Sequence, residues 1–134
     1  MSGMSSDLAH AQDMVDAWNR MDWDRVVALF AADGVLHSMM QDPIVGRPDI
    51  ETRIRSLTAG LERIELRVKA MGVIDGRVFI ERVDDFDING RHVEVPVVGI
   101  LRFDADGLVT EWLEYYDRAT MMRGMGLPAD FSHS

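Results

Sequence analysis

Two strand-like segments of the chain carry charged side chains in line with apolar ones. Arg82 and Asp84 lie in the segment 78–86, and Asp117 ends the segment 109–117. Side chains alternate between two faces along a strand, so each charged residue shares its face with every second neighbour. The apolar residues expected on these faces are Val78, Ile80, Phe86, Val109, Leu113 and Tyr115.

These residue types are suited to general acid–base chemistry. A charge buried without a partner is costly, so such groups either form ion pairs or take part in chemistry. Two carboxylates around one guanidinium can keep one acid protonated and the other ionised. The sequence therefore predicts a catalytic set of Arg82, Asp84 and Asp117. Two structural alternatives remain open: Arg82 and Asp84 as an ion pair across the sheet, and Asp117 as the cap of the turn at 118–120.

The opposite face of the first segment is also charged. Glu81, Asp85 and Asp87 lie there, and we expect them to be solvated or to lie at an interface. His92 and Glu94 share a face of the following segment and form a candidate interface pair.

Composition limits the class of protein. The chain has 134 residues, of which 47% are hydrophobic, which predicts one domain at 7–134 after a flexible tail at 1–6. A net charge of −9 argues against nucleic acid or an anionic membrane as partner. There is no cysteine, and the histidines lack the spacing of metal ligands, so no metal site is expected. The N-terminus does not resemble a signal peptide, and no apolar run is long enough to span a membrane, so a cytoplasmic location is expected.

The first half of the chain has the periodicity of amphipathic helices. Apolar side chains recur at helical spacing over 7–21, and Asp22 or Asp24 is placed to cap a second, short helix. A short strand is predicted at 35–39, and Pro48 suits the first turn of another helix.

The second half changes to the period of two that is typical of strands. Strands are predicted at 63–73, 77–88, 91–103 and 108–117. The turn signals between them are Asp75-Gly76, Asn89-Gly90 and Asp106-Gly107. Helices followed by an antiparallel meander predict an α+β fold, in which the helices pack on one face of a curved, mostly antiparallel sheet. The methionines in 120–128 are interpreted as packing residues, with an adaptable pocket wall as the alternative.

Several of these residues together resemble the limonene-1,2-epoxide hydrolase family. They are Glu81-Arg82-Val83-Asp84, Trp112-x-x-Tyr115-x-Asp117 and Pro43-x-x-Gly46-Arg47 before a helix. The resemblance covers about residues 8–128. The family has the nuclear-transport-factor-2-like (SnoaL-like) cone fold, shared with ketosteroid isomerases and polyketide cyclases. The resemblance implies that the sheet is strongly curved and mixed, and that it forms a cone with an internal pocket.

The resemblance also implies roles for individual residues. Asp84 would protonate the epoxide oxygen, Asp117 would deprotonate the attacking water, and Arg82 would bridge the two carboxylates. No cofactor is implied. The expected substrate pocket is formed by Leu36, Ile80, Phe86, Leu113 and Tyr115.

The water site departs from the family pattern. The family holds the water with a Tyr and an Asn, and the corresponding positions here are Leu36 and Ser38. A shift of one residue would instead place His37 and Met39 there. Leu36 has no group that can bind water, so Ser38 and His37 are the candidates to position it.

Three hypotheses of function follow. The first is hydrolysis of a small apolar epoxide by water to a vicinal diol. The second is an isomerase or cyclase that acts next to a carbonyl, and the third is a non-catalytic module that binds a small molecule. We also expect a homodimer through the outer face of the sheet, with Glu94, Val98 and Trp112 as candidate contacts. Trp112 and Tyr116 are interpreted as core or dimer contacts rather than substrate contacts.

Overall fold

The computed structural model describes residues 3–128 of the chain. Its helices are α1 (Gly3–Asn19), α2 (Trp23–Ala28), α3 (Arg47–Leu57) and α4 (Arg118–Gly124). Its strands are β1 (Phe30–Ser38), β2 (Ile44–Val45), β3 (Leu61–Ile74), β4 (Arg77–Ile88), β5 (Arg91–Phe103) and β6 (Val109–Tyr116). The predicted α+β class is confirmed.

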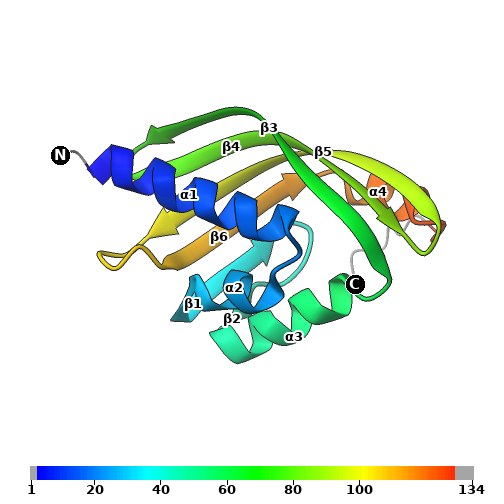
Figure 1. Cartoon of the computed structure of the whole chain (residues 1–134), viewed down its shortest axis with the longest axis horizontal. Helices are drawn as coiled ribbons and strands as arrows, with labels where there is room; N and C mark the ends of the chain where they lie inside the picture. The colour runs from blue at the N-terminus through cyan, green and yellow to red at the C-terminus, as the bar shows by residue number, and fades with distance from the viewer. Residues whose placement is uncertain (1–2, 129–134) are drawn as a thin grey trace.

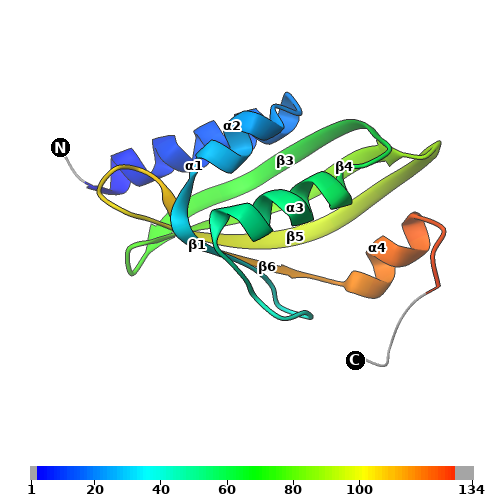
Figure 2. The same ribbon diagram turned by 90° about the horizontal axis from the view of Figure 1, so that it is seen from below.

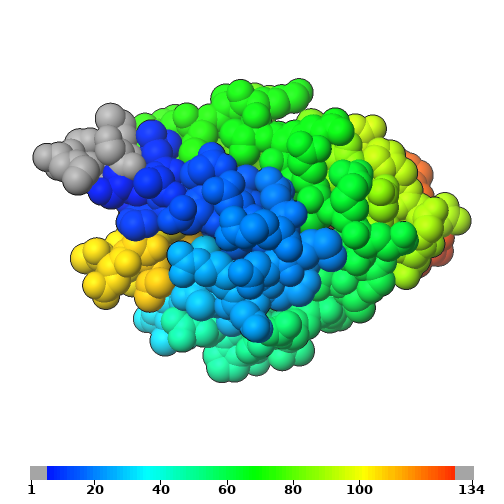
Figure 3. Space-filling view, viewed as in Figure 1, coloured from blue at the N-terminus to red at the C-terminus, as the bar shows by residue number. Residues whose placement is uncertain are grey.

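The strands form one open sheet of six strands in the order β2-β1-β6-β5-β4-β3. Neighbouring strands are antiparallel except β1 and β6, which are parallel, so the sheet is mixed as expected. Figure 1 shows the long strands β3, β4 and β5 bending around α1, and Figure 2 shows α3 on the same side of the sheet. In the space-filling view α1 and α2 cover this face, with β3 and α3 at its border (Figure 3).

The turns between the long strands follow from local residue chemistry. Asp75 and Gly76 have φ values of 52° and 72°, and Asn89 and Gly90 have 51° and 79°. Two consecutive residues with positive φ define the tight turn whose twist matches that of a hairpin. The connection before β6 is longer than predicted, because the Asp104 side chain accepts hydrogen bonds from the backbone N–H groups of residues 106 and 108.

The helical half agrees with the sequence patterns except at two boundaries. Asp22 caps α2 as expected, since its side chain accepts a hydrogen bond from the Arg25 backbone N–H. Helix α1 begins at Gly3 rather than at residue 7, and β1 begins at Phe30 rather than at residue 35. Phe30 is fully buried, so the start of β1 lies in the core.

A β-bulge at Thr110 determines which side chains of β6 face the helices. Glu111 pairs with Arg102 of β5, and Val109 pairs with Phe103, so Thr110 is the extra residue. Its hydroxyl donates to the Arg102 carbonyl at 3.1 Å. An inserted residue reverses the alternation of the strand beyond it. Val109 and Trp112 are therefore both buried in the same core cluster, although strict alternation would separate them.

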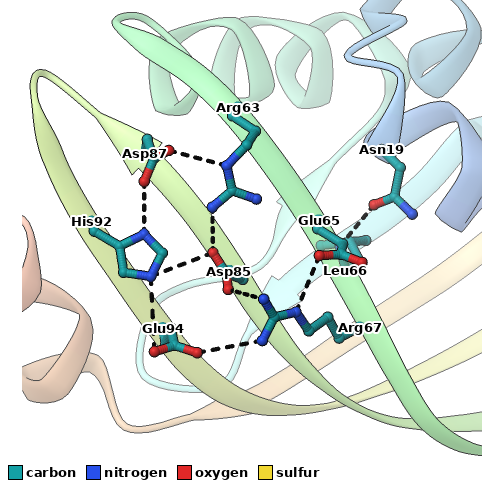
Figure 4. Close-up of polar contacts among 9 residues, drawn as sticks. All are labelled: Asn19, Arg63, Glu65, Leu66, Arg67, Asp85, Asp87, His92 and Glu94. Atoms are coloured by element: carbon teal, nitrogen blue, oxygen red, sulfur yellow. Dashed lines mark hydrogen bonds and ion pairs between the residues drawn. The ribbon is translucent and has the colours of Figure 1, made fainter.

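The outer face of β3, β4 and β5 carries a network of ion pairs around Asp85 (Figure 4). Asp85 is only 2% exposed because Arg63 and Arg67 both contact its carboxylate. His92 Nδ1 lies 2.7 Å from Asp87 Oδ1 in the same network. The expectation that Asp85 is solvated is wrong, because the two arginines cover it within the chain itself.

Two further features of the described residues bear on the expected partners. Within 3–128, no helix combines the length and the apolar character that crossing a bilayer requires. Trp112 was interpreted as a core or dimer contact, and the core interpretation is confirmed, since it is 4% exposed and belongs to the core cluster. Its expected place on the outer face is wrong.

Candidate active site

Arg82 lies at the centre of a buried group of charges on the inner face of the sheet. Its Nε donates to Asp84 Oδ1 at 2.7 Å and its Nη2 to Asp84 Oδ2 at 3.1 Å. On its other side, Nη1 donates to Glu114 Oε2 at 3.1 Å and Nη2 donates to Glu114 Oε1. Trp112 Nε1 also donates to Glu114 Oε2, at 2.9 Å. We call Asp84, Arg82 and Glu114 the carboxylate–arginine cluster.

The cluster is largely shielded from solvent, and burial affects the pKa of two of its members, Arg82 and Glu114. Arg82 is 3% exposed, and the side chains of Asp84 and Glu114 are 17% and 16% exposed. Burial raises the pKa of the Glu114 carboxyl, and the charge of Arg82 only partly offsets this effect. Burial lowers the pKa of Arg82, but the charges of Glu114 and Asp84 outweigh it and raise that pKa, so the guanidinium stays ionised.

Gly99 of β5 makes this cluster possible. Arg82 and Glu114 come from β4 and β6, which flank β5 and are therefore roughly 10 Å apart. Gly99 pairs with Glu114 in the register of β5 and β6, and it has no side chain to obstruct the contact. A Cβ at this position would lie 2.5 Å from Arg82 Nη1 and 2.7 Å from Glu114 Oε2. A glycine inside a strand is the sequence signal of such a close approach, and it went unused in the sequence analysis.

The structure corrects the expected partner of Arg82. Asp117 is an exposed residue at the N-cap of α4, where it accepts hydrogen bonds from the Ala119 backbone N–H at 3.1 Å and the Thr120 hydroxyl at 2.7 Å. The hydrogen bond from Thr120 lowers the pKa of the Asp117 carboxyl. The alternative interpretation of Asp117 as a cap is therefore confirmed. Strict alternation along the last strand predicted Asp117 as the partner of Arg82, whereas the bulge in β6 places Glu114 on the inner face instead.

The cluster lines a cavity of about 350 Å³ between the sheet and helices α3 and α4. Its wall is mostly apolar. Met121, Met122 and Met125 of α4 belong to it, and Met121 and Met125 also pack against the core, so both interpretations of the methionines agree with the structure. Flexible methionine side chains allow such a wall to adapt to ligands of different shape.

Only some of the expected pocket residues line the cavity. Leu36 and Phe86 line the cavity. Ile80 is instead a core residue at 1% exposure. The prediction was wrong for Leu113 and Tyr115, because the bulge turns the odd-numbered residues of this part of β6 to the outer face. Tyr115 is accordingly 44% exposed.

The two candidates for holding water lie on opposite faces of β1. Ser38 lines the cavity, and its hydroxyl donates to the Tyr116 hydroxyl at 2.9 Å. His37 alternates to the other face, where it pairs in register with Leu113. Tyr116 packs against the core cluster that contains Phe86 and Val95, so its interpretation as a core contact is confirmed, and it also lines the cavity.

A possible metal-ligand group lies away from this cavity. Asp85, His92 and Glu94 bring potential ligand atoms together on the outer face. However, Arg63 and Arg67 already bind the Asp85 carboxylate, so its charge is compensated without a metal. Within residues 3–128 this is the group with metal-ligand character, and it is separate from the carboxylate–arginine cluster.

Replacing Gly99 with Ala is expected to separate Arg82 from Glu114, because the new Cβ would occupy their contact. We expect a loss of about 1–3 kcal/mol in the free energy of unfolding, as for other overpacked cores. Denaturant unfolding measures this loss. Gly72→Ala is the matched control, because Gly72 also lies in a strand and a Cβ there would meet nothing within 4 Å. Equal stability of the two variants would contradict the role assigned to Gly99.

Fold and site together define a small α+β protein with an acid–base cluster in an apolar cavity. Residues 11–112 match the family of the SnoaL-like domain, and the chain belongs to this family. The expected relationship to SnoaL-like proteins is thus confirmed.

One similar protein is found by sequence, and others are found by fold. The chain is 28% identical over 111 residues to epoxide hydrolase EphG of Mycobacterium tuberculosis, covering 83% of this chain and 73% of EphG. An LEH-like epoxide hydrolase of M. tuberculosis superposes with a TM-score of 0.79 at 23% identity, covering 93% of this chain and 96% of that one. A putative SnoaL-like polyketide cyclase from Shewanella denitrificans gives a TM-score of 0.80 at 16% identity, covering 90% and 96%. The last two likenesses show the cone fold, which is common to different activities.

Proposed function

We propose that this protein is an epoxide hydrolase that opens a small apolar epoxide with water to give a vicinal diol. The observation that carries the proposal is the position of Arg82 between two partly buried carboxylates in the wall of an apolar cavity. The sequence similarity to epoxide hydrolase EphG supports the same activity.

The reaction needs a base and an acid at the same time, because water is a poor nucleophile and an alkoxide is a poor leaving group. Glu114 takes a proton from the water while the water oxygen forms a bond to one ring carbon. The bond from that carbon to the ring oxygen breaks, and the ring oxygen takes a proton from Asp84. Glu114 is then protonated and Asp84 is ionised, and the transfer of one proton between them restores the cluster.

Charge and hydrogen bonding support this division of roles. Glu114 accepts N–H donors from Arg82 and Trp112 on both oxygens, which suits an ionised carboxylate. Its raised pKa makes it a stronger base than a glutamate in water. Asp84 also contacts Arg82 through both of its oxygens, and its assignment as the acid follows the resemblance of Arg82-x-Asp84 to the limonene-1,2-epoxide hydrolase family.

The proposal is tested by incubating the protein with a panel of small cyclic and linear epoxides and measuring diol formation. We expect turnover by the native chain and a loss of about a hundredfold or more in Asp84→Asn, because Asn cannot supply the proton. Folding of the variant is checked by its unfolding midpoint. If the folded native protein forms no diol from any epoxide, the proposed activity is refuted.

An isomerase or cyclase is the second candidate. The structural likeness to polyketide cyclases favours it, and a base with a raised pKa also suits the removal of a proton next to a carbonyl. In that reaction Glu114 would take the carbon-bound proton and Asp84 would stabilise the enolate. Deuterium uptake from heavy water into a panel of ketones distinguishes this candidate, since epoxide hydrolysis predicts none.

A further inference from the structure

We propose that Ser38 and Tyr116 form a hydroxyl pair that holds the nucleophilic water against Glu114, with Ser38 binding the water and Tyr116 orienting Ser38. The inference rests on the proposed epoxide hydrolysis and identifies the water site of that reaction. It gives a positioning role to Tyr116 at the end of β6.

The first argument is the position of the pair. Ser38 is the register partner of Glu114 across the parallel pair β1 and β6, and both side chains line the cavity. Neighbouring strands of a sheet lie about 5 Å apart, so register partners on one face are close together. Tyr116 follows Glu114 by two residues and lies on the same face. A water molecule in front of Glu114 is therefore within reach of the hydroxyl pair.

The second argument is the number of free hydrogen-bonding positions. A carboxylate offers about four acceptor positions. Glu114 Oε2 receives Arg82 Nη1 and Trp112 Nε1, and Oε1 receives Arg82 Nη2. One position on Oε1 is thus left to accept a hydrogen from water. Arg82 and Trp112 position the Glu114 carboxylate, but neither supplies a second contact that would orient the water.

The hydroxyl pair supplies that second contact. Ser38 Oγ donates its hydrogen to the Tyr116 hydroxyl at 2.9 Å, so its lone pairs are free to accept. A water that donates one hydrogen to Glu114 and the other to Ser38 Oγ keeps a lone pair for the ring carbon. Tyr116 does not touch this water. It keeps the Ser38 hydrogen directed away from the water site, so it is a positioning residue.

This arrangement makes a specific prediction about combined substitutions. Ser38→Ala removes the acceptor, and Tyr116→Phe lets the serine hydroxyl turn its hydrogen toward the water. Each change should lower kcat for diol formation about tenfold, which is the effect expected for one lost hydrogen bond. Because Tyr116 acts through Ser38, the double variant should be no slower than Ser38→Ala alone. Ser38→Thr keeps the hydroxyl and should restore kcat to within a few-fold of the native value.

The experiment measures kcat and KM for all four variants, together with the regiochemistry of opening of an unsymmetrical epoxide in ¹⁸O-labelled water. We expect KM to change little, and the label to shift between the two carbons in Ser38→Ala and Tyr116→Phe, because the water is no longer held in one direction. If the Ser38–Tyr116 hydrogen bond only stabilised the contact between β1 and β6, its loss would not change the label distribution. Tyr115→Phe is the matched control, since Tyr115 is the neighbouring tyrosine on the outer face.

The outcomes separate this inference from the proposed function. If the native chain hydrolyses epoxides but Ser38→Ala and Tyr116→Phe keep native kcat and label distribution, the hydroxyl pair is refuted while the hydrolase remains. Additive losses in the double variant would refute the action of Tyr116 through Ser38. If the native chain opens no epoxide at all, the proposed function fails and the inference fails with it.

Discussion

Replacing Glu114 with Gln is expected to lower diol formation by about a hundredfold to ten-thousandfold, the range typical of a lost general base. Gln has nearly the same shape as Glu, so the cavity keeps its form, but the amide cannot take a proton from water. Asp117→Asn should keep turnover close to the native rate. Asn is also a good helix cap, so it preserves the start of α4 and the methionines that line the cavity.

The pH dependence gives an independent test of the same base. Glu114 must be ionised to act, so kcat/KM falls as the pH drops through its pKa. Burial raises that pKa, so the acidic limb of the pH profile should lie at a higher pH than for an ordinary glutamate. If Asp117 were the base, the acidic limb would lie at a lower pH than for an ordinary aspartate, because the hydrogen bond from Thr120 lowers the pKa of Asp117. An acidic limb at or below the range of a surface carboxyl would therefore exclude Glu114 as the base.

Asp117→Asn and Glu114→Gln must differ in activity if Glu114 is the base. Thermal unfolding of both proteins establishes that any loss of activity is chemical. If Asp117→Asn is as inactive as Glu114→Gln while both are folded, the base is misassigned. Native activity in Glu114→Gln alone would refute the acid–base mechanism built on the cluster.

Replacing Arg82 with Met is expected to have the largest effect on stability. Arg82 is almost fully buried, and its loss leaves Asp84 and Glu114 in the cavity wall without a counter-charge. Breaking a buried ion pair from one side costs about 3–5 kcal/mol. The loss in the free energy of unfolding should be measured by denaturant titration near neutral pH.

The pH dependence of this loss follows from the sign of the Glu114 shift. A carboxyl with a raised folded-state pKa destabilises the fold above its unfolded pKa, and the cost grows until the folded pKa is passed. Removing Arg82 removes the charge that lowers this pKa, so the cost in the variant should be larger at pH 7.5 than at pH 5. The control is the triple variant with Asp84→Asn and Glu114→Gln, which has no charge left in the carboxylate–arginine cluster and should be more stable than Arg82→Met alone. If the triple variant is no more stable, lost packing explains the effect rather than unpaired charge.

The sequence determined the elements of the fold because their signals are local. The turn residues Asp75-Gly76 and Asn89-Gly90 adopt the positive φ values that their chemistry permits, and the strands on either side follow. The same holds for Asp22 at the start of α2. Arg82 and Asp84 were placed together because both lie on one regular strand, in which alternation alone determines the shared face.

Only the tertiary structure determined which residue supplies the second carboxylate of the cluster. The bulge at Thr110 reverses the alternation of β6, so Glu114 rather than Asp117 faces the cavity. A bulge depends on the pairing of β6 with its neighbours, and the residues around Thr110 do not predict it. Likewise, Gly99 opens the path between Arg82 and Glu114 only because β5 lies between β4 and β6. Side-chain periodicity is a property of one strand, whereas contacts across three strands depend on register, which the completed sheet determines.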